Sequence, residues 1–268
     1  MELVDTHAHF ADGDDVAAIY ARAAAAGVTR ILAIGGSEEL NRNALRTPGR
    51  VALGWDRDQL ERVADRMAAL PGLLDAHRDR VAAIGEVGLD CHYEPQTLKA
   101  QCDLFARQLA LADERGLPVV IHTREADDAT RGVLDEVPWR HGDRLRGVIH
   151  SYTGGPKFAG QMLDRGFMVS FSGIATFKSA EEVRASARYV PDDRILVETD
   201  SPYLAPVPLR GRPCEPAFVV HTATRLALER GLDLEVFAAL TTANAVALFG
   251  GPGGWACTET ETGRERSR

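Results

Sequence analysis

The sequence predicts a single α/β domain folded as a (β/α)8 TIM barrel, and three observations indicate this fold. The chain has 268 residues, a length that suits one barrel. Hydrophobic residues make up 45% of it and charged residues 26%, which is an ordinary globular composition. Eight short apolar runs alternate with amphipathic helical stretches, and this alternation is typical of right-handed βαβ units.

One pattern recurs along the chain: a polar or alanine-rich helical stretch ends in glycine, and a β-branched run follows it. Gly27, Gly116 and Gly166 stand at such junctions. Glycine suits the left-handed position that closes a helix, and the short apolar runs fit parallel strands that are covered on both faces. The expected strands lie near residues 2–7, 28–34, 51–55, 81–86, 117–121, 145–150, 167–172 and 194–199.

The remaining segments fit the same barrel. The proline-rich stretch 201–215 indicates an ordered loop beside an active site, and two further helices near 216–230 and 233–249 close the fold. We therefore expect one barrel domain over residues 1–250 and a flexible polar tail over 251–268. An open doubly wound sheet is the alternative, but no GxGxxG follows the first strand, which removes its usual dinucleotide-binding version.

Charge and cysteine content narrow the functional classes. The formal net charge is −8, which argues against a broad surface that coats nucleic acid. The four cysteines include no CxxC pair, so a zinc knot is not expected. The chain shows neither a signal-peptide pattern nor an apolar run of about 20 residues. We expect a cytoplasmic protein with no membrane contact and no obligate protein partner.

Two histidines stand one residue apart at the end of the first expected strand, in "ELVDTHAHF". On a strand, residues i and i+2 point to the same face, so His7 and His9 offer two nitrogens to one metal ion. A pair of ordinary surface or core histidines has the same spacing. The pattern gains its meaning from the residues at the other strand ends.

Groups that commonly ligate metals follow four more of the expected strands. The fourth expected strand ends in "AIGEVGLD", which supplies Glu86, and the fifth ends in "VVIHTRE", which supplies His122. The sixth ends in "GVIHSYTGG", with His150, and the eighth ends in "ILVETDSP", with Glu198 and Asp200. Any one of these side chains alone could be a core residue or a helix cap. In a barrel, however, the carboxyl ends of all strands meet around one pocket, so the sequence predicts a shared metal site there.

Four imidazoles and two or three carboxylates are too many ligands for one tetrahedral ion and suit two ions bridged by a carboxylate. We expect Glu86 to bridge, His7 and His9 to hold one ion, and His122 with His150 to hold the other. Asp200 could ligate and also accept a proton from the attacking water. Nitrogen and oxygen ligands fit zinc, manganese, magnesium or cobalt, and the sequence does not choose among them.

Six motifs, in order across about residues 1–250, resemble the TatD family of metal-dependent deoxyribonucleases: "DTHAH", "GEVGLD", "IHTRE", "IHSYTG", "VETDSPYLAP" and "RGRPCEP". The resemblance implies an amidohydrolase-like barrel, a divalent-metal centre and hydrolysis of phosphodiester bonds, typically at 3′ ends of DNA. Matched motif by motif, it implies the ligands His7, His9, Glu86, His122, His150 and Asp200. Glu86 and Asp200 are the expected catalytic residues.

The chain departs from the family pattern at two positions. After the third strand the family usually carries "GxHP", and this chain reads "LGWDRDQ", with Asp56 in the place of the histidine. The motif that resembles "RNEP" reads "RPCEP", so Cys214 replaces the usual asparagine. Neither change removes an expected metal ligand, and both could alter how the substrate is handled.

A phosphodiester needs positive charge and contact surface beyond the metal ions. Arg124 is the best placed to face a phosphate oxygen, and Arg210 lies in the proline-rich loop that could close over the site. Tyr152 and Tyr203 are candidates for stacking on a base. For each of these four, an ordinary surface or wall position is the alternative.

Three functions are compatible with these residues. The first is a phosphodiesterase that acts on DNA ends, which suits an acidic chain without a basic groove. The second is a metal-dependent hydrolase of another bond, such as a small-molecule ester, lactone or amide, or an aminoacyl ester on tRNA. The third is a barrel that binds metal or nucleic acid without turnover, which the large ligand set disfavours.

Overall fold

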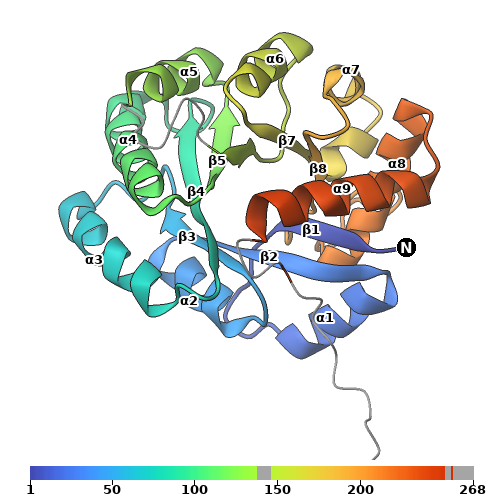
Figure 1. The fold of residues 1–268 in the computed structure, drawn as a ribbon, viewed down its shortest axis with the longest axis horizontal. Coiled ribbons are helices and arrows are strands. Elements are labelled where there is room, and N and C mark those ends of the chain that lie inside the picture. The colour runs from blue at the N-terminus through green and yellow to red at the C-terminus, as the bar shows by residue number, and fades with distance from the viewer. Residues whose placement is uncertain (138–145, 251–254, 256–268) are drawn as a thin grey trace, which may run out of the picture.

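The structure is a computed structural model that describes residues 1–137, 146–250 and 255. Eight parallel strands form one sheet in sequential order from β1 to β8, with helices around the outside (Figure 1). The strands are β1 (Leu3–Ala8), β2 (Val28–Gly36), β3 (Val51–Trp55), β4 (Val81–Asp90), β5 (Val119–Arg124), β6 (Gly147–Ile149), β7 (Met168–Phe171) and β8 (Ile195–Val197). The predicted (β/α)8 barrel is confirmed.

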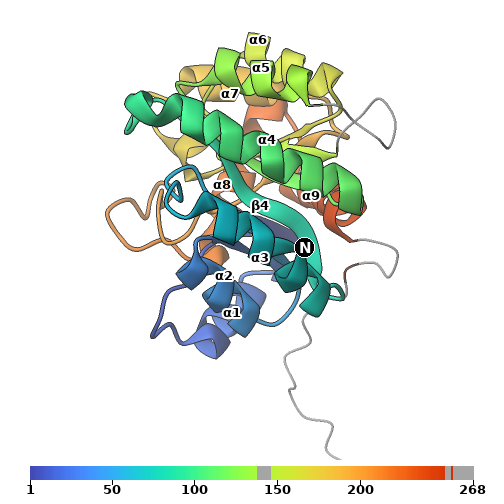
Figure 2. The same cartoon turned by 90° about the vertical axis from the view of Figure 1, so that its left-hand side faces the viewer.

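The helices alternate with the strands as expected. They are α1 (Val16–Ala25), α2 (Glu38–Arg46), α3 (Val63–Ala76), α4 (Leu98–Arg115), α5 (Asp127–Glu136), α6 (Pro156–Asp164), α7 (Glu181–Tyr189), α8 (Val219–Arg230) and α9 (Leu234–Phe249). Short 3-10 helices lie at Pro95–Thr97, Gly173–Thr176 and Pro216–Phe218. In the view of Figure 2, α4 to α7 lie toward the top and α1 to α3 toward the bottom, with β4 between them.

Local sequence explains where these helices begin and end. The side chains of Asp15 and Ser37 accept hydrogen bonds from the backbone of the first turns of α1 and α2, as N-cap residues do. Gly27, Gly116 and Gly166 all have positive φ just after a helix, at 85°, 62° and 90°. The predicted glycine stops are confirmed, because only glycine adopts this backbone region without strain.

Two apolar clusters hold the barrel together. The larger one lies between the strands and the surrounding helices, because alternate strand residues point outward to them. The other strand residues form the smaller cluster, which α9 helps to complete. It includes Val4, Leu32, Ala52, Val120, Val148 and Leu196, together with Phe249 and Trp255. The ring of Trp255 lies 6.3 Å from that of Phe249. The other residues of the expected tail lie outside the described residues.

The barrel closes between β1 and β8 by a seam that is weaker than the other strand pairings. No register of paired strand residues joins these two strands in the described structure, apart from one isolated parallel bridge just beyond β8. Two backbone hydrogen bonds cross the seam: His9 N donates to Ser201 O at 2.8 Å, and Asp200 N donates to His7 O at 3.0 Å. The seam therefore lies directly beside residues that the sequence predicts as metal ligands.

Among the described residues, no single helix has the length and apolar character needed to cross a membrane. Two consecutive helical segments, Pro216–Arg230 and Leu234–Phe249, pass that test only when they are taken together, and the chain bends by 109° between them. Cys91, Cys102 and Cys214 are free thiols, so the described cysteines form no disulfide.

Candidate metal centre

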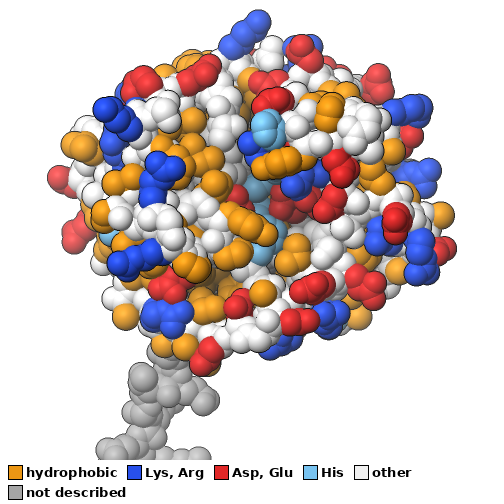
Figure 3. Space-filling model, turned by 180° about the vertical axis from the view of Figure 1, so that it is seen from behind, with side chains coloured by type: hydrophobic (Ala, Val, Ile, Leu, Met, Phe, Trp, Pro, Cys, Tyr) orange, Lys and Arg blue, Asp and Glu red, His pale blue; other side chains and the backbone are white. Residues whose placement is uncertain are grey.

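All six predicted ligands converge at the carboxyl ends of the strands. His7 lies near the end of β1 and His9 follows it, whereas Glu86 and His122 lie within β4 and β5. His150 and Asp200 come just after β6 and β8. A space-filling view shows histidine side chains within a hollow that acidic and basic side chains surround (Figure 3). The convergence that the sequence predicts is therefore present.

The carboxylate of Glu86 lies between two pairs of histidines. Its Oε2 is 3.5 Å from His7 Nε2 and 3.3 Å from His9 Nε2. Its Oε1 is 3.1 Å from both His122 Nδ1 and His150 Nε2. Glu86 is only 5% exposed, so this carboxylate interacts with the imidazoles and not with bulk water. Each oxygen thus has its own pair of nitrogens.

The spacing within each pair fits a shared metal ion. His7 Nε2 lies 3.0 Å from His9 Nε2, and His122 Nδ1 lies 3.2 Å from His150 Nε2. Two nitrogens bound to one tetrahedral zinc ion at about 2.0–2.1 Å lie roughly 3.3 Å from each other. The donors are nitrogen and oxygen atoms with no thiolate, which is the set that the sequence predicts. The residues present therefore fit divalent metal ions.

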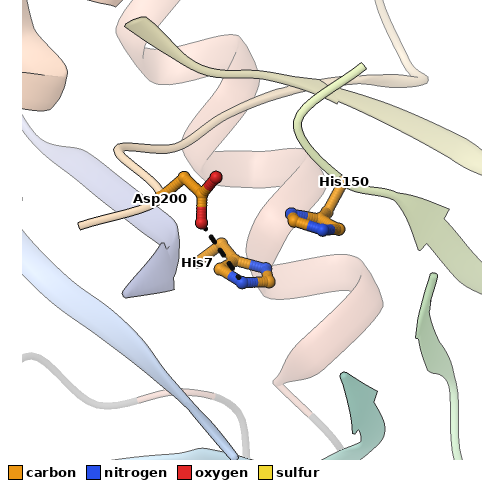
Figure 4. Close-up of side chains that lie close together, drawn as sticks. All are labelled: His7, His150 and Asp200. Carbon is orange, nitrogen blue, oxygen red and sulfur yellow. Dashed lines mark ion pairs between the residues drawn. The ribbon is translucent and has the colours of Figure 1, made fainter. Parts of the chain in front are cut away.

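Figure 4 shows the Asp200 carboxylate directed toward the His7 ring, with the His150 ring beside it. Asp200 Oδ1 is 3.8 Å from His7 Nε2 and 3.9 Å from His9 Nε2, and it also groups with His150 within ligating range. The backbone of Asp200 has a φ of 58°, in the left-handed region. Aspartate and asparagine tolerate this region better than most residues, so the turn itself favours such a side chain here.

Buried groups orient the imidazoles from behind. His150 Nδ1 is 3.2 Å from Glu198 Oε1, and His122 Nε2 is 3.2 Å from Asp90 Oδ2. His9 Nδ1 is 3.2 Å from the carbonyl oxygen of Ile34. Such partners fix the ring orientation and make the nitrogen facing the metal a better ligand.

Replacing Glu198 with glutamine should weaken metal binding roughly 10- to 100-fold, as loss of comparable partners does at other sites. Glu198 is fully buried, and glutamine has nearly the same shape but no charge to stabilise the His150 ring. Competition with a coloured chelator would measure the metal affinity. A variant that folds like the wild type and binds metal within twofold of it would contradict this role.

Burial and mutual contacts set the protonation of the metal-free site. Burial, together with the nearby His150, lowers the pKa of His7 to about 4, so this ring is neutral at pH 7. Burial also opposes charge on His150, but Glu86 and Glu198 outweigh it and hold its pKa well above the usual value. Burial raises the pKa of Asp200 to about 6. Metal ions must therefore displace protons from this site.

We expect metal loading to release protons from His150, His9 and His122, because burial opposes charge on these imidazoles but contacts with carboxylates outweigh it and raise the pKa of each. About one further proton should be released at pH 5, from Asp200. Below pH 6 the Asp200 carboxyl is mostly protonated, so metal affinity should fall as the pH decreases through this range. Calorimetry in two buffers of different ionisation enthalpy would count the protons. D200N should release about one proton fewer than the wild type at pH 5 and about the same number at pH 7. Equal proton release by both proteins at pH 5 would contradict the assignment to Asp200.

The stretch that departs from the family pattern contributes to the same pocket. Asp56 and Arg57 follow β3, and the Asp56 carboxylate pairs with Arg57 Nη1. Arg57 Nη1 is 3.7 Å from Glu86 Oε1, and its Nε is 3.4 Å from Asp90 Oδ2. The other departure, Cys214, is a buried thiol whose Sγ lies 4.0 Å from the carbonyl oxygen of Thr199. It is not among the groups that could hold a metal ion.

The two arginines expected to hold the substrate are engaged elsewhere. Arg124 donates to the Tyr93 hydroxyl at 3.2 Å, and its guanidinium lies 4.9 Å from the centre of that ring. Arg210 lies 4.2 Å from the ring centre of Phe177. Neither has an ion pair with a described metal-ligand candidate. Their roles as phosphate contacts remain predictions.

The two tyrosines differ from each other. Tyr203 is 63% exposed, and its ring lies 6.5 Å from that of His9, so a base could stack beside the pocket. Tyr152 is 2% exposed, donates its hydroxyl to Gly155 O at 2.7 Å and packs against Phe171. Tyr152 is thus largely buried, although it also lines a cavity of about 610 Å³, and its stacking on a substrate base remains a prediction.

Two functional positions escape the sequence argument. We expected β4 to end at Glu86, but it continues to Asp90, whose carboxylate orients His122. The spacing of four residues along one strand was a usable signal, since both side chains then face the same side. The only sequence signal for Arg57 is its position next to Asp56, in the motif that departs from the family pattern.

A cavity of about 610 Å³ is lined in part by residues that follow β5 and β6, and none of the six candidate ligands lines it. Four acidic side chains line it: Glu125, Asp127, Asp128 and Glu182. Its negative charge opposes the entry of a polynucleotide backbone.

The chain is a (β/α)8 barrel whose strand ends carry a nitrogen and oxygen donor set that could hold divalent metal ions. It belongs to the TatD family, because the family's sequence model, TatD related DNase, matches residues 4–250. The metal-dependent hydrolase YcfH of Escherichia coli K12 is 45% identical over 174 residues, or 65% of this chain. This match spans 64% of YcfH, just under two thirds of its length.

Other relatives match over nearly the whole chain. The 3′-5′ ssDNA/RNA exonuclease TatD of Salmonella typhimurium is 35% identical over 260 residues, which cover 91% of this chain and 95% of that protein. The crystal structure of YJJV, a TatD homologue from Escherichia coli K12, superposes with a TM-score of 0.83 at 28% identity. The superposition covers 93% of this chain and 98% of the YJJV chain.

Proposed function

We propose that this protein is a phosphodiesterase that removes nucleotides from DNA ends and uses two divalent ions, of magnesium, manganese or zinc. The observation that carries the proposal is the placement of Glu86, whose two oxygens each face a separate pair of imidazole nitrogens. A carboxylate in this bridging position suits a pair of ions that together stabilise a displacement at phosphorus.

The chain's own residues would divide the chemistry between them. His7, His9, Glu86 and Asp200 would hold one ion, and Glu86, His122 and His150 the other. When bound, such ions lower the pKa of water and so supply hydroxide near neutral pH. Asp200 would accept the water's proton on its carboxylate, acting as the general base. Glu198 and Asp90 keep the imidazoles oriented.

The choice of DNA ends rests on charge and on one relative. With a net charge of −8, the chain suits an enzyme that holds a terminal nucleotide more than one that grips a long duplex. The exposed Tyr203 beside His9 offers a stacking surface for one base. A 35% identical relative bears the name 3′-5′ ssDNA/RNA exonuclease, which supports a nucleic-acid substrate here.

The acidic cavity at the ends of β5 and β6 favours a second candidate function. Glu125, Asp127, Asp128 and Glu182 would attract a positively charged group on a small substrate. An aminoacyl ester on tRNA carries an ammonium group next to the scissile bond, and some small amides do as well. The same metal centre could hydrolyse such a bond on this scaffold.

A substrate panel separates the two candidates. The protein would be loaded in turn with Mg²⁺, Mn²⁺ and Zn²⁺ and given labelled single-stranded DNA, a bis(p-nitrophenyl) phosphate, a lactone and an aminoacyl-tRNA. Release of mononucleotides from DNA would support the phosphodiesterase. Turnover of the lactone or aminoacyl ester without DNA cleavage would replace it with the second candidate, and binding of metal without any turnover would remove both.

A further inference from the structure

We propose that Arg57 binds a non-bridging oxygen of the substrate's phosphate, and that Asp56 and Asp90 are the positioning residues that hold its guanidinium at the metal centre. This inference rests on the proposed phosphodiesterase and identifies the cation that would recognise its substrate. It also gives a role to the segment in which the chain departs from the family pattern.

Arg57 lies closer to the predicted bridging group than the arginines that the sequence favoured. Its Nη1 is 3.7 Å from Glu86 Oε1, whereas Arg124 and Arg210 pack against aromatic rings. An anion that ligates ions held by Glu86 would lie within a few ångströms of this guanidinium. At that distance, in a site largely shielded from water, the attraction between opposite charges is strong.

The guanidinium is held in place by two carboxylates. Nη1 pairs with Asp56 Oδ2, and Nε lies 3.4 Å from Asp90 Oδ2. Asp56 is itself fixed, because its backbone N–H donates to Gly36 O at 2.7 Å and its Oδ1 accepts from the backbone N–H of Arg57 at 2.7 Å. A planar guanidinium fixed in this way loses little side-chain freedom when a ligand binds.

The remaining nitrogen of Arg57 is free to bind an anion. Nη2 donates no hydrogen bond to any residue that the structure describes, and the side chain is 25% exposed. It borders a cavity of about 190 Å³ that is lined also by Asp58, Asp90, Tyr93, Glu94 and Gln101. The three carboxylates disfavour a run of phosphates there, and Arg57 is the one cationic side chain in this lining that could hold a single oxyanion. This matches an enzyme that acts at a strand end.

The alternative is that Arg57 only neutralises the carboxylates around it. The two roles predict different results. A purely neutralising arginine would affect metal affinity and leave the affinity for phosphate of the metal-loaded protein unchanged. A phosphate-binding arginine would affect the affinity for phosphate even when both metal sites are full.

The test measures the binding of inorganic phosphate to the manganese-loaded full chain by calorimetry. R57Q should weaken phosphate binding roughly 10- to 100-fold, the usual consequence of losing hydrogen bonds between charged groups. R57K keeps the charge beside Glu86 but lacks the planar fork, so it should fall between R57Q and the wild type. The KM for bis(p-nitrophenyl) phosphate should rise in the same order. Arg62→Gln, which removes an exposed arginine that also pairs with an aspartate, is the matched control.

A double-mutant cycle tests the positioning role of Asp56. D56N should weaken phosphate binding several-fold in the wild-type background and have little further effect in the R57Q background, because Asp56 acts through Arg57. Additive losses would overturn this part of the proposal. Metal content, measured on every variant, shows that each comparison is made with the sites loaded.

Two results would overturn the role of Arg57 itself: wild-type phosphate affinity in R57Q, or losses of phosphate affinity in R57Q and R57K that merely follow their losses of bound metal. The proposed function fails separately. A wild-type protein that binds phosphate through Arg57 but cleaves no phosphodiester in the panel would retain the anion site and lose the phosphodiesterase.

Discussion

Replacing Glu86 with glutamine is expected to lower phosphodiester turnover by a factor on the order of 10³ or more and to reduce the bound metal from two ions to one or none. Both oxygens of Glu86 face imidazole pairs, at 3.1 to 3.5 Å. Glutamine keeps one oxygen and replaces the other with an N–H₂ group, which cannot ligate a cation. It also removes the negative charge that offsets two divalent ions.

Elemental analysis of the purified variant and single-turnover kinetics would measure the two effects of E86Q. Glu235→Gln is the matched control, because Glu235 is exposed in the first turn of α9, far along the chain from any predicted ligand. The thermal unfolding midpoint of the metal-free proteins would show that the fold survives. Two bound ions and near wild-type turnover in E86Q would remove Glu86 from the bridging position.

Replacing Asp200 with asparagine is expected to lower kcat by roughly 10²- to 10⁴-fold while most of the bound metal is retained. Asparagine keeps an oxygen for ligation and tolerates the φ of 58° at this position, so the backbone turn should persist. It lacks the carboxylate that would accept the proton of the attacking water. The loss should therefore fall on kcat, with a smaller effect on KM.

The kinetics of D200N would be measured against bis(p-nitrophenyl) phosphate at saturating Mn²⁺. Asp103→Asn serves as the control, since Asp103 pairs with Lys99 on the exposed face of α4. A D200N variant that retains the wild-type kcat with full metal content would show that another group accepts the proton. Loss of metal in proportion to loss of activity would assign Asp200 to ligation alone.

The barrel and the six ligand positions could be predicted because both follow from short-range patterns. Apolar runs that alternate with helical stretches indicate parallel strands, and parallel strands in a barrel bring their carboxyl ends to one face. His122 and His150 stand 28 positions apart, yet their ring nitrogens approach to 3.2 Å for this reason alone. The position of each candidate ligand at the end of its own strand was sufficient for this prediction, because the barrel brings the strand ends together.

The surroundings of the ligands could not be predicted in the same way. Whether Tyr152 faces the pocket or the core depends on how β6, β7 and α6 pack, which is a tertiary property. The role of Asp90 depends on a strand that continues past Glu86, and strand ends are poorly marked by sequence. Arg57 depends on the direction of a long flexible side chain, and only the three carboxylates around it settle that direction.

The seam between β1 and β8 gives the metal centre a mechanical consequence. His7 belongs to the first strand and Asp200 follows the last, so an ion bound by both would act as a clasp that ties the start of the barrel to its end. Only two of the backbone hydrogen bonds described above join β1 and its end to the segment that follows β8. The hydrogen bonds that Thr199 donates to the Asp5 carboxylate and that Thr6 donates to Val197 O also cross this seam. We expect bound cations to add to these contacts and so to stabilise the closure of the cylinder.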